Sequence, residues 1–234
     1  MRVFVYQYHL IGQKLIMNKD YIVKKKFIKK DVADLSALYT FYTFLSKVSY
    51  EGFDQQIPLS YSIPTDPLME GISTLSHLKM EKITGLELLP TYTYFRFYKP
   101  GDILKPHIDR DACEISATIC LGWDYKGAAN DYRWPIYIEG TKVVLEIGDA
   151  AVYKGIEIEH WRDEFIAEEG SWHAQAFLHY VDKNGPYAKH IWDQVKNPVN
   201  WRGNDIFGYR HHARQTDYNY NIDKDKYYYA NVHI

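Results

Sequence analysis

The chain has 234 residues, of which 46% are hydrophobic and 25% charged, so it is long enough to bury one sizeable core. Its formal net charge of -2 excludes a general attraction to nucleic acids or anionic membranes. The two cysteines, Cys113 and Cys120, form no CxxC pair, which excludes a disulfide framework and favours a reducing, cytoplasmic location. Residues 3–16 are too polar for a signal peptide or a membrane-spanning segment. Met17 is an alternative first residue of the natural protein.

Two helices are predicted in the first third of the chain. Residues 31–48 carry apolar side chains at helical spacing. A loop follows, and Asp66 before Pro67 is typical of a helix start. The second helix is predicted over 68–83, and Gly85 ends it.

From residue 86 onward the pattern changes to short strands separated by glycine-containing turns. Two helices followed by many short strands indicate a mainly β fold, a sheet-on-sheet barrel with flanking α-helices. We expect a single domain made of a helical support region (1–85), a catalytic core (86–182) and a C-terminal extension that wraps the core (183–234). The predicted strands have β-branched and aromatic residues and cover 91–98, 115–121, 135–138, 142–147, 150–153 and 173–181.

The residues that carry chemistry are His107, Asp109 and His160. Alternate residues of an extended segment share a face, so His107 and Asp109 can bind one ion, and His160 must come from a neighbouring strand. Two imidazoles and one carboxylate on one face of a metal leave three adjacent positions open, which is the arrangement of non-haem Fe(II) oxygenases. His179 has no acidic partner at ligand spacing and is interpreted as a core or solvent residue.

The segments around this triad resemble the prolyl 4-hydroxylase-like branch of the 2-oxoglutarate dioxygenases. The resemblance covers about two-fifths of the chain and rests on four segments, RFYKPGDILKPHIDR, CEISATICLGWD, EIGDAAVYKGIEIEHWR and QAFLHYVD. It implies a double-stranded β-helix (a jelly-roll, cupin-like core) with Fe(II) at one open end. It also implies that 2-oxoglutarate binds the iron, that O2 is consumed, and that succinate and CO2 are released as a C–H bond is hydroxylated. Ascorbate is a candidate reductant.

The far carboxylate of 2-oxoglutarate needs a cation, because a buried unpaired charge is costly. In the family a Lys or Arg follows the second histidine by nine to eleven residues, but here His173 aligns with that position. Arg162 is the predicted replacement, with Tyr98 and His173 as hydrogen-bond partners. Arg96, on the same strand face as Tyr98, is the alternative cation.

The substrate is less constrained by the sequence. Arg110 and Trp161 directly follow two of the metal ligands and are the predicted substrate contacts. A peptide side chain, with proline first, is the leading substrate, and a free amino acid or other small molecule is the alternative. A nucleic-acid demethylase ranks below both because the chain is slightly acidic. A non-catalytic metal-binding β-barrel module, or a Zn(II) site built from the same ligands, is the competing interpretation of the triad.

Overall fold

The computed structural model describes residues 21–46, 56–57 and 60–193. A six-stranded antiparallel sheet forms its centre, in the order β1-β8-β5-β10-β3-β2. A four-stranded antiparallel sheet has the order β4-β9-β6-β7. The bounds of the large sheet are β1 (Tyr21–Lys24), β2 (Tyr61–Pro64), β3 (Leu88–Tyr98), β5 (Ile115–Asp124), β8 (Ala150–Tyr153) and β10 (Trp172–Asp182). Those of the small sheet are β4 (Leu104–His107), β6 (Ile136–Ile138), β7 (Thr141–Val143) and β9 (His160–Arg162).

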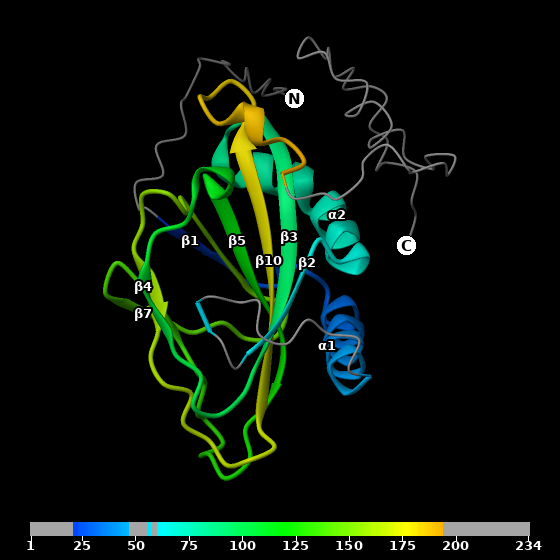
Figure 1. Cartoon of the computed structure of the whole chain (residues 1–234), viewed down its shortest axis with the longest axis vertical. Coiled ribbons are helices and arrows are strands. Elements are labelled where there is room, and N and C mark those ends of the chain that lie inside the picture. The colour runs from blue at the N-terminus through cyan, green and yellow to red at the C-terminus, as the bar shows by residue number, and fades with distance from the viewer. Residues whose placement is uncertain (1–20, 47–55, 58–59, 194–234) are drawn as a thin grey trace, which may run out of the picture.

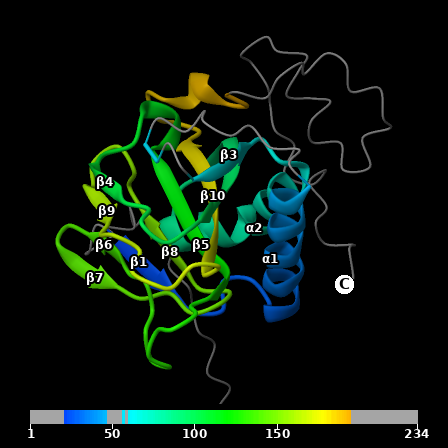
Figure 2. The ribbon, with the colours of Figure 1, turned by 60° about the horizontal axis from the view of Figure 1, so that its bottom comes forward.

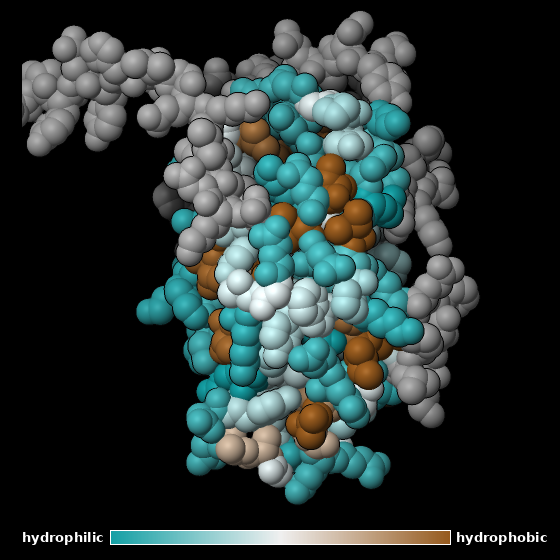
Figure 3. Space-filling view, turned by 90° about the vertical axis from the view of Figure 1, so that its left-hand side faces the viewer, coloured by the Kyte–Doolittle hydropathy of each residue, from teal (hydrophilic) through white to brown (hydrophobic). Residues whose placement is uncertain are grey.

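The elements form three layers. Helices α1 (Lys30–Leu45) and α2 (Pro67–Thr84) cover one face of the large sheet, and the small sheet lies on the other side (Figures 1 and 2). The surface on the side of the small sheet is mostly hydrophilic, with separate small hydrophobic spots (Figure 3). Neither described helix is long and apolar enough to span a membrane.

Alternation along the long strands separates two interiors. Every second residue packs under the helices, as Phe95 and Phe97 of β3 do together with alanines and leucines of the neighbouring strands. The residues between them point into the space between the two sheets. On β10 these inward positions hold His173, Gln175, Phe177 and His179, which alternate with the helix-facing residues Ala174, Ala176 and Leu178. The interior between the sheets therefore combines hydrophobic clusters with buried polar side chains from β10, and these polar side chains suit a ligand site.

Both predicted helices are confirmed, although α1 ends at Leu45 and residues 47–48 of its predicted range lie outside the described residues. In α2 the Asp66 side chain accepts hydrogen bonds from the backbone N–H groups of Leu68 and Met69, and Gly85 ends the helix with a left-handed φ of 72°. The strand predicted over 142–147 is shorter, because β7 ends at Val143. The chain then enters a turn in which the Asp149 carboxylate accepts the N–H of Glu146 at 3.0 Å.

The structure adds strands that the sequence pattern did not indicate, β1 and β2 among them. Both lie within the predicted helical support region, residues 1–85, and both pair with the large sheet. Beyond β10 the described chain includes a 3-10 helix at Ala188–His190 and ends near β3, where Trp192 N–H donates to the Pro90 carbonyl at 3.1 Å. The rest of the predicted wrap, from residue 194, and the alternative start at Met17 lie outside the described residues.

Candidate metal centre

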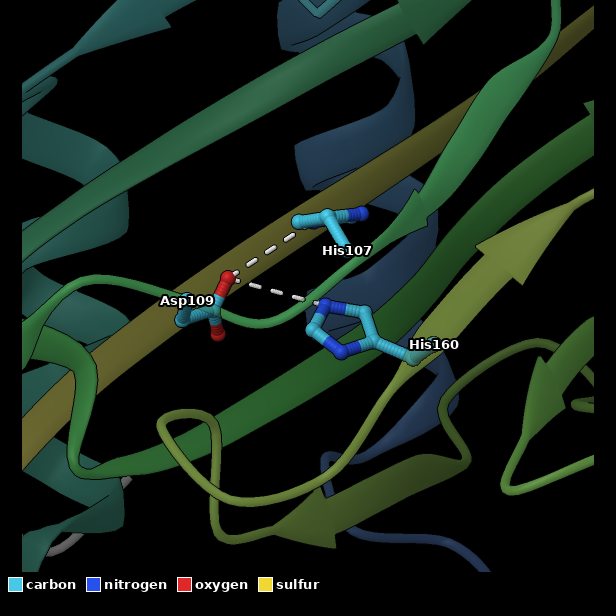
Figure 4. A group of neighbouring side chains, drawn as sticks. All are labelled: His107, Asp109 and His160. Carbon is cyan, nitrogen blue, oxygen red and sulfur yellow. Dashed lines mark ion pairs between the residues drawn. The ribbon is translucent and has the colours of Figure 1, made fainter.

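The three predicted metal ligands converge at one end of the small sheet. His107 is the last residue of β4 and His160 the first of β9, and the two residues are register partners in this antiparallel pair. Asp109 follows β4 by two residues, and its N–H donates to the Gly155 carbonyl at 2.8 Å. All three side chains point toward one another (Figure 4).

The distances between the ligand atoms fit a single ion. Asp109 Oδ1 lies 3.7 Å from His107 Nε2 and 3.6 Å from His160 Nε2. Two atoms that bind one metal at about 2.1 Å each can lie no more than about 4.2 Å apart. All three ligand atoms lie within 4.8 Å of one another. The three predicted ligands thus lie together in the structure, and only small movements are needed to close the ligand set on an ion.

Hydrogen bonds set the orientation of both imidazole rings. Nδ1 of His107 lies 2.8 Å from the Lys105 carbonyl, and Nδ1 of His160 lies 2.9 Å from the Ile158 carbonyl. A carbonyl only accepts, so each Nδ1 carries the proton and each Nε2 presents a lone pair toward Asp109. Metal-bound histidines in proteins are held in this way by carbonyl or carboxylate partners. The donor set therefore fits a divalent transition metal.

Burial shifts the acid–base chemistry of all three groups. It raises the pKa of Asp109 to about 6 and lowers the pKa of His107, an effect to which the neighbouring His160 ring adds. Burial lowers the pKa of His160 as well. At neutral pH the carboxylate is ionised and both rings are neutral, which are the protonation states that metal ligation requires.

Arg162 is buried next to the aromatic core between the sheets. It is 2% exposed, its guanidinium lies 4.7 Å from the centroid of the Trp134 ring, and it donates to the Trp134 carbonyl at 3.0 Å. No carboxylate of the described residues forms an ion pair with it. Its guanidinium also lies 5.8 Å from the centroid of the Tyr98 ring, so the structure brings the predicted Arg162 and Tyr98 together.

Tyr98 also connects Arg162 to the alternative cation. Arg96, 1% exposed, donates to the Tyr98 hydroxyl at 3.0 Å and to the side-chain oxygen of Gln56 at 3.1 Å. The Tyr98 ring thus lies close to two buried guanidinium groups, with its centroid 5.4 Å from the guanidinium carbon of Arg96 and 5.8 Å from that of Arg162.

His173 lies near this pair, but its hydrogen-bonding capacity is already in use. Its Nδ1 is 2.7 Å from the Tyr125 hydroxyl, and its Nε2 is 2.7 Å from Oε1 of Gln175. Gln175 continues the chain by donating to Thr118 at 2.7 Å. Burial, with the charge of Arg162 adding to it, lowers the pKa of His173 to about 3, so the ring is neutral. Neither ring nitrogen is left to bind 2-oxoglutarate in this arrangement.

The two predicted substrate contacts have different surroundings. Arg110 packs over the Tyr92 ring at 4.7 Å and forms an ion pair with Asp193, so it lies where the end of the described chain returns to the metal centre. Trp161 stacks on Tyr137, with ring centroids 5.3 Å apart and planes 9° apart. Adjacent strand residues point to opposite faces, so Trp161 lies on the face of β9 away from His160. The structure does not bring Trp161 to the metal centre.

Several polar residues near the triad were not identified from the sequence. Tyr94 and Tyr153 are among them: the Tyr153 ring lies 4.7 Å from the His160 ring, and burial raises the pKa of both phenols well above the usual range. Ser116 and His179 are the others, and they line up behind Asp109. The sequence did hold a signal for these residues. Polar residues stand at alternate positions of the strands 115–121 and 173–181, whereas the inward-facing residues of a barrel are ordinarily apolar.

No protein-family model matches this sequence, and no curated protein matches it. Solved structures match its fold. SnoN, a non-heme α-ketoglutarate-dependent epimerase from nogalamycin biosynthesis, aligns with a TM-score of 0.57 at 11% identity, over 70% of this chain and 78% of its own. HygX from Streptomyces hygroscopicus, with nickel, 2-oxoglutarate and hygromycin B bound, aligns with a TM-score of 0.52 at 12% identity, over 75% of this chain and 88% of its own. A Pseudomonas putida prolyl-4-hydroxylase aligns with a TM-score of 0.50 at 15% identity, over 68% of this chain and 92% of its own.

The fold is the double-stranded β-helix of the 2-oxoglutarate-dependent oxygenases. The fold class predicted from the sequence is thereby confirmed. In this double-stranded β-helix the triad lies between the two sheets at one end, and the buried Arg162 lies on the same strand as His160, two residues further along.

Proposed function

We propose that this chain is an Fe(II)- and 2-oxoglutarate-dependent dioxygenase that hydroxylates a C–H bond. The observation that carries the proposal is the convergence of His107 Nε2, Asp109 Oδ1 and His160 Nε2 inside this fold. Such a ligand set binds iron on one face and leaves three adjacent positions for 2-oxoglutarate and O2. When bound, the iron and co-substrate supply the oxidising chemistry, with release of succinate and CO2.

The residues of the chain position the reactants and exclude water. Arg162 is the proposed partner of the far carboxylate of 2-oxoglutarate, because its buried charge lacks an ion-pair partner among the described residues and a buried charge is costly unless paired. Tyr98 supports the same site: its oxygen accepts from Arg96, which leaves its own proton free to donate to an anion. With Asp109 as the third protein ligand, 2-oxoglutarate and O2 would take the three remaining positions and leave none for a halide ion, which favours hydroxylation over halogenation.

A peptide side chain is the proposed substrate, with proline first. The fold likeness to a prolyl-4-hydroxylase and the half-buried tyrosines Tyr92 and Tyr94 on the side of Arg110 support it. A small-molecule substrate is the second candidate, because a structure of the same fold holds hygromycin B. In either case Arg110 can contact the substrate only if it gives up its ion pair with Asp193.

The test is incubation with Fe(II), 2-oxoglutarate and ascorbate in the presence of proline-containing peptides and, separately, free amino acids. We expect succinate to form with the wild-type chain and a gain of one oxygen on a peptide. Oxidation of a free amino acid without peptide oxidation would move the substrate to the small-molecule class. Wild-type protein that binds metal but forms no succinate from 2-oxoglutarate would contradict the oxygenase assignment and favour the non-catalytic metal-binding module.

A further inference from the structure

The two oxygens of the Asp109 carboxylate have different environments. Oδ1 faces the two histidines, whereas Oδ2 faces the large sheet and lies 3.1 Å from the hydroxyl of Ser116 on β5. Gly155 closes the space beside it: a Cβ atom there would lie 2.4 Å from Oδ2 and 2.3 Å from the Cys113 carbonyl. The carboxylate is thus held from behind and presents a single oxygen to the metal position.

Ser116 is in turn contacted by His179 of β10, the next strand of the large sheet. The Ser116 oxygen lies 3.0 Å from His179 Nδ1, and it also lies 3.1 Å from the Cys113 carbonyl. Nε2 of His179 is buried and has no hydrogen-bond partner within the described part of the chain. The ring is 3% exposed and packs against Tyr92, with centroids 4.7 Å apart.

The direction of the proton in each contact follows from these partners. Ser116 has one hydroxyl proton, and the carboxylate of Asp109 is a stronger acceptor than the neutral carbonyl or imidazole. If Ser116 donates to Asp109, the contact with His179 requires Nδ1–H to donate to Ser116. The opposite tautomer would leave a buried N–H at Nε2 without an acceptor, and an unsatisfied buried donor is less tolerated than an unsatisfied acceptor.

We propose that Ser116 and His179 are positioning residues for the metal-binding aspartate, joined as His179 Nδ1–H to Ser116 Oγ–H to Asp109 Oδ2. The chain of bonds turns the carboxylate so that Oδ1 alone faces the metal, which keeps three coordination positions open. This inference rests on the proposed function for its consequence, whereas the hydrogen-bond chain itself belongs to the metal-free protein.

The hydrogen-bond chain is tested by the tautomer of His179 in metal-free protein labelled with 15N at histidine. Two-bond 1H–15N spectra at pH 7.5 distinguish a proton on Nδ1 from one on Nε2, and the His179→Asn variant assigns the signals. We expect Nδ1–H in the wild type and a changed Nδ1 signal in Ser116→Ala. An Nε2–H tautomer would overturn the proposed direction of the bonds.

The effect on the metal ligand is tested by Mn(II) affinity, followed through the EPR signal of free Mn(II). We expect Ser116→Ala to weaken binding by about 10- to 100-fold, the range for lost outer-shell partners, and His179→Leu by about tenfold. His179→Asn, whose amide N–H can replace Nδ1–H, should restore most of the affinity. Ser73→Ala is the matched control, since Ser73 bonds the Tyr180 hydroxyl at 3.0 Å on the helix side of the sheet. It should bind Mn(II) like the wild type.

The outcomes separate this inference from the proposed function. Wild-type binding of Mn(II) with no loss in Ser116→Ala or His179→Leu would overturn the positioning role and leave the oxygenase proposal intact. Absence of Mn(II) binding in the wild type would overturn the proposed function and with it the metal-positioning role. The tautomer measurement would then still decide whether the three side chains are joined.

Discussion

His107 and His160 face each other across the β4–β9 pair, and their ring centroids are 4.3 Å apart. Side chains at directly opposed positions of an antiparallel pair lie on one face within about 5.5 Å. The register of two short strands therefore sets the spacing of two predicted metal ligands that are far apart in the sequence. A slip of one residue would move His160 to the outer face, where Trp161 now lies.

Removal of the carboxylate should abolish metal binding. We expect Asp109→Ala to lose more than about 100-fold in Mn(II) affinity, beyond the range seen for outer-shell partners, and to release no succinate. Asp111→Ala is the control, because this exposed aspartate lies two residues away in the 3-10 helix Asp111–Cys113. Titration with Mn(II) measures both, and full activity in Asp109→Ala would rule out the triad.

Arg162→Met should weaken 2-oxoglutarate binding by roughly ten- to a hundredfold, because a charge-assisted hydrogen bond to a buried ion contributes about 1.5–3 kcal/mol. Arg133→Met is a suitable control, since Arg133 stacks on Trp123 at 4.1 Å and pairs with Glu146. Calorimetric titration of 2-oxoglutarate into Mn(II)-loaded protein gives the affinities. Wild-type affinity in Arg162→Met, with loss in Arg96→Met, would transfer the role to Arg96.

A methyl group at Gly155 should disturb the metal centre. The added Cβ would meet the Cys113 carbonyl and the Asp109 carboxylate at 2.3 and 2.4 Å, so backbone and ligand must shift. We expect Gly155→Ala to lower both the thermal midpoint and the Mn(II) affinity. Gly71→Ala tests the same substitution where a Cβ meets nothing within 4 Å, inside α2, and should raise the free energy of unfolding by up to about 1 kcal/mol. Equal behaviour of the two variants would contradict the close packing at Gly155.

The free energy of unfolding should fall as the pH drops below the pKa of an unfolded histidine, about 6.5. His173 has a folded pKa of about 3, so between these values the unfolded chain takes up a proton that the folded protein does not. The resulting loss is about 1.4 kcal/mol per pH unit for this one group. Urea unfolding of metal-free protein at pH 6 and pH 5 should therefore show a smaller loss in His173→Gln than in the wild type. Parallel losses in the two proteins would show that His173 is protonated when folded.

Features that depend on neighbours along the chain could be predicted from the sequence. Asp66, Pro67 and Gly85 bound α2 as predicted, because capping uses residues within one turn. The long strands β3, β5 and β10 were predicted from their composition, since side-chain alternation is a local property. The HxD triplet and the distal histidine were identified because their spacing and flanking segments resemble a known family.

Contacts between side chains on different strands could not be predicted in this way, because they depend on how distant segments pack. The short strands β4 and β9 have four and three residues, too few for a periodic pattern, and they form through pairing with distant segments. Pairing of β9 with β6 directs Trp161 outward onto Tyr137. Packing between other distant segments brings the Tyr125 hydroxyl to His173 and Ser116 behind Asp109. Strand register and sheet order set these contacts. Neither is encoded in the alternation of any one strand, so His179 could be recognised as a residue behind the metal centre only in the folded chain.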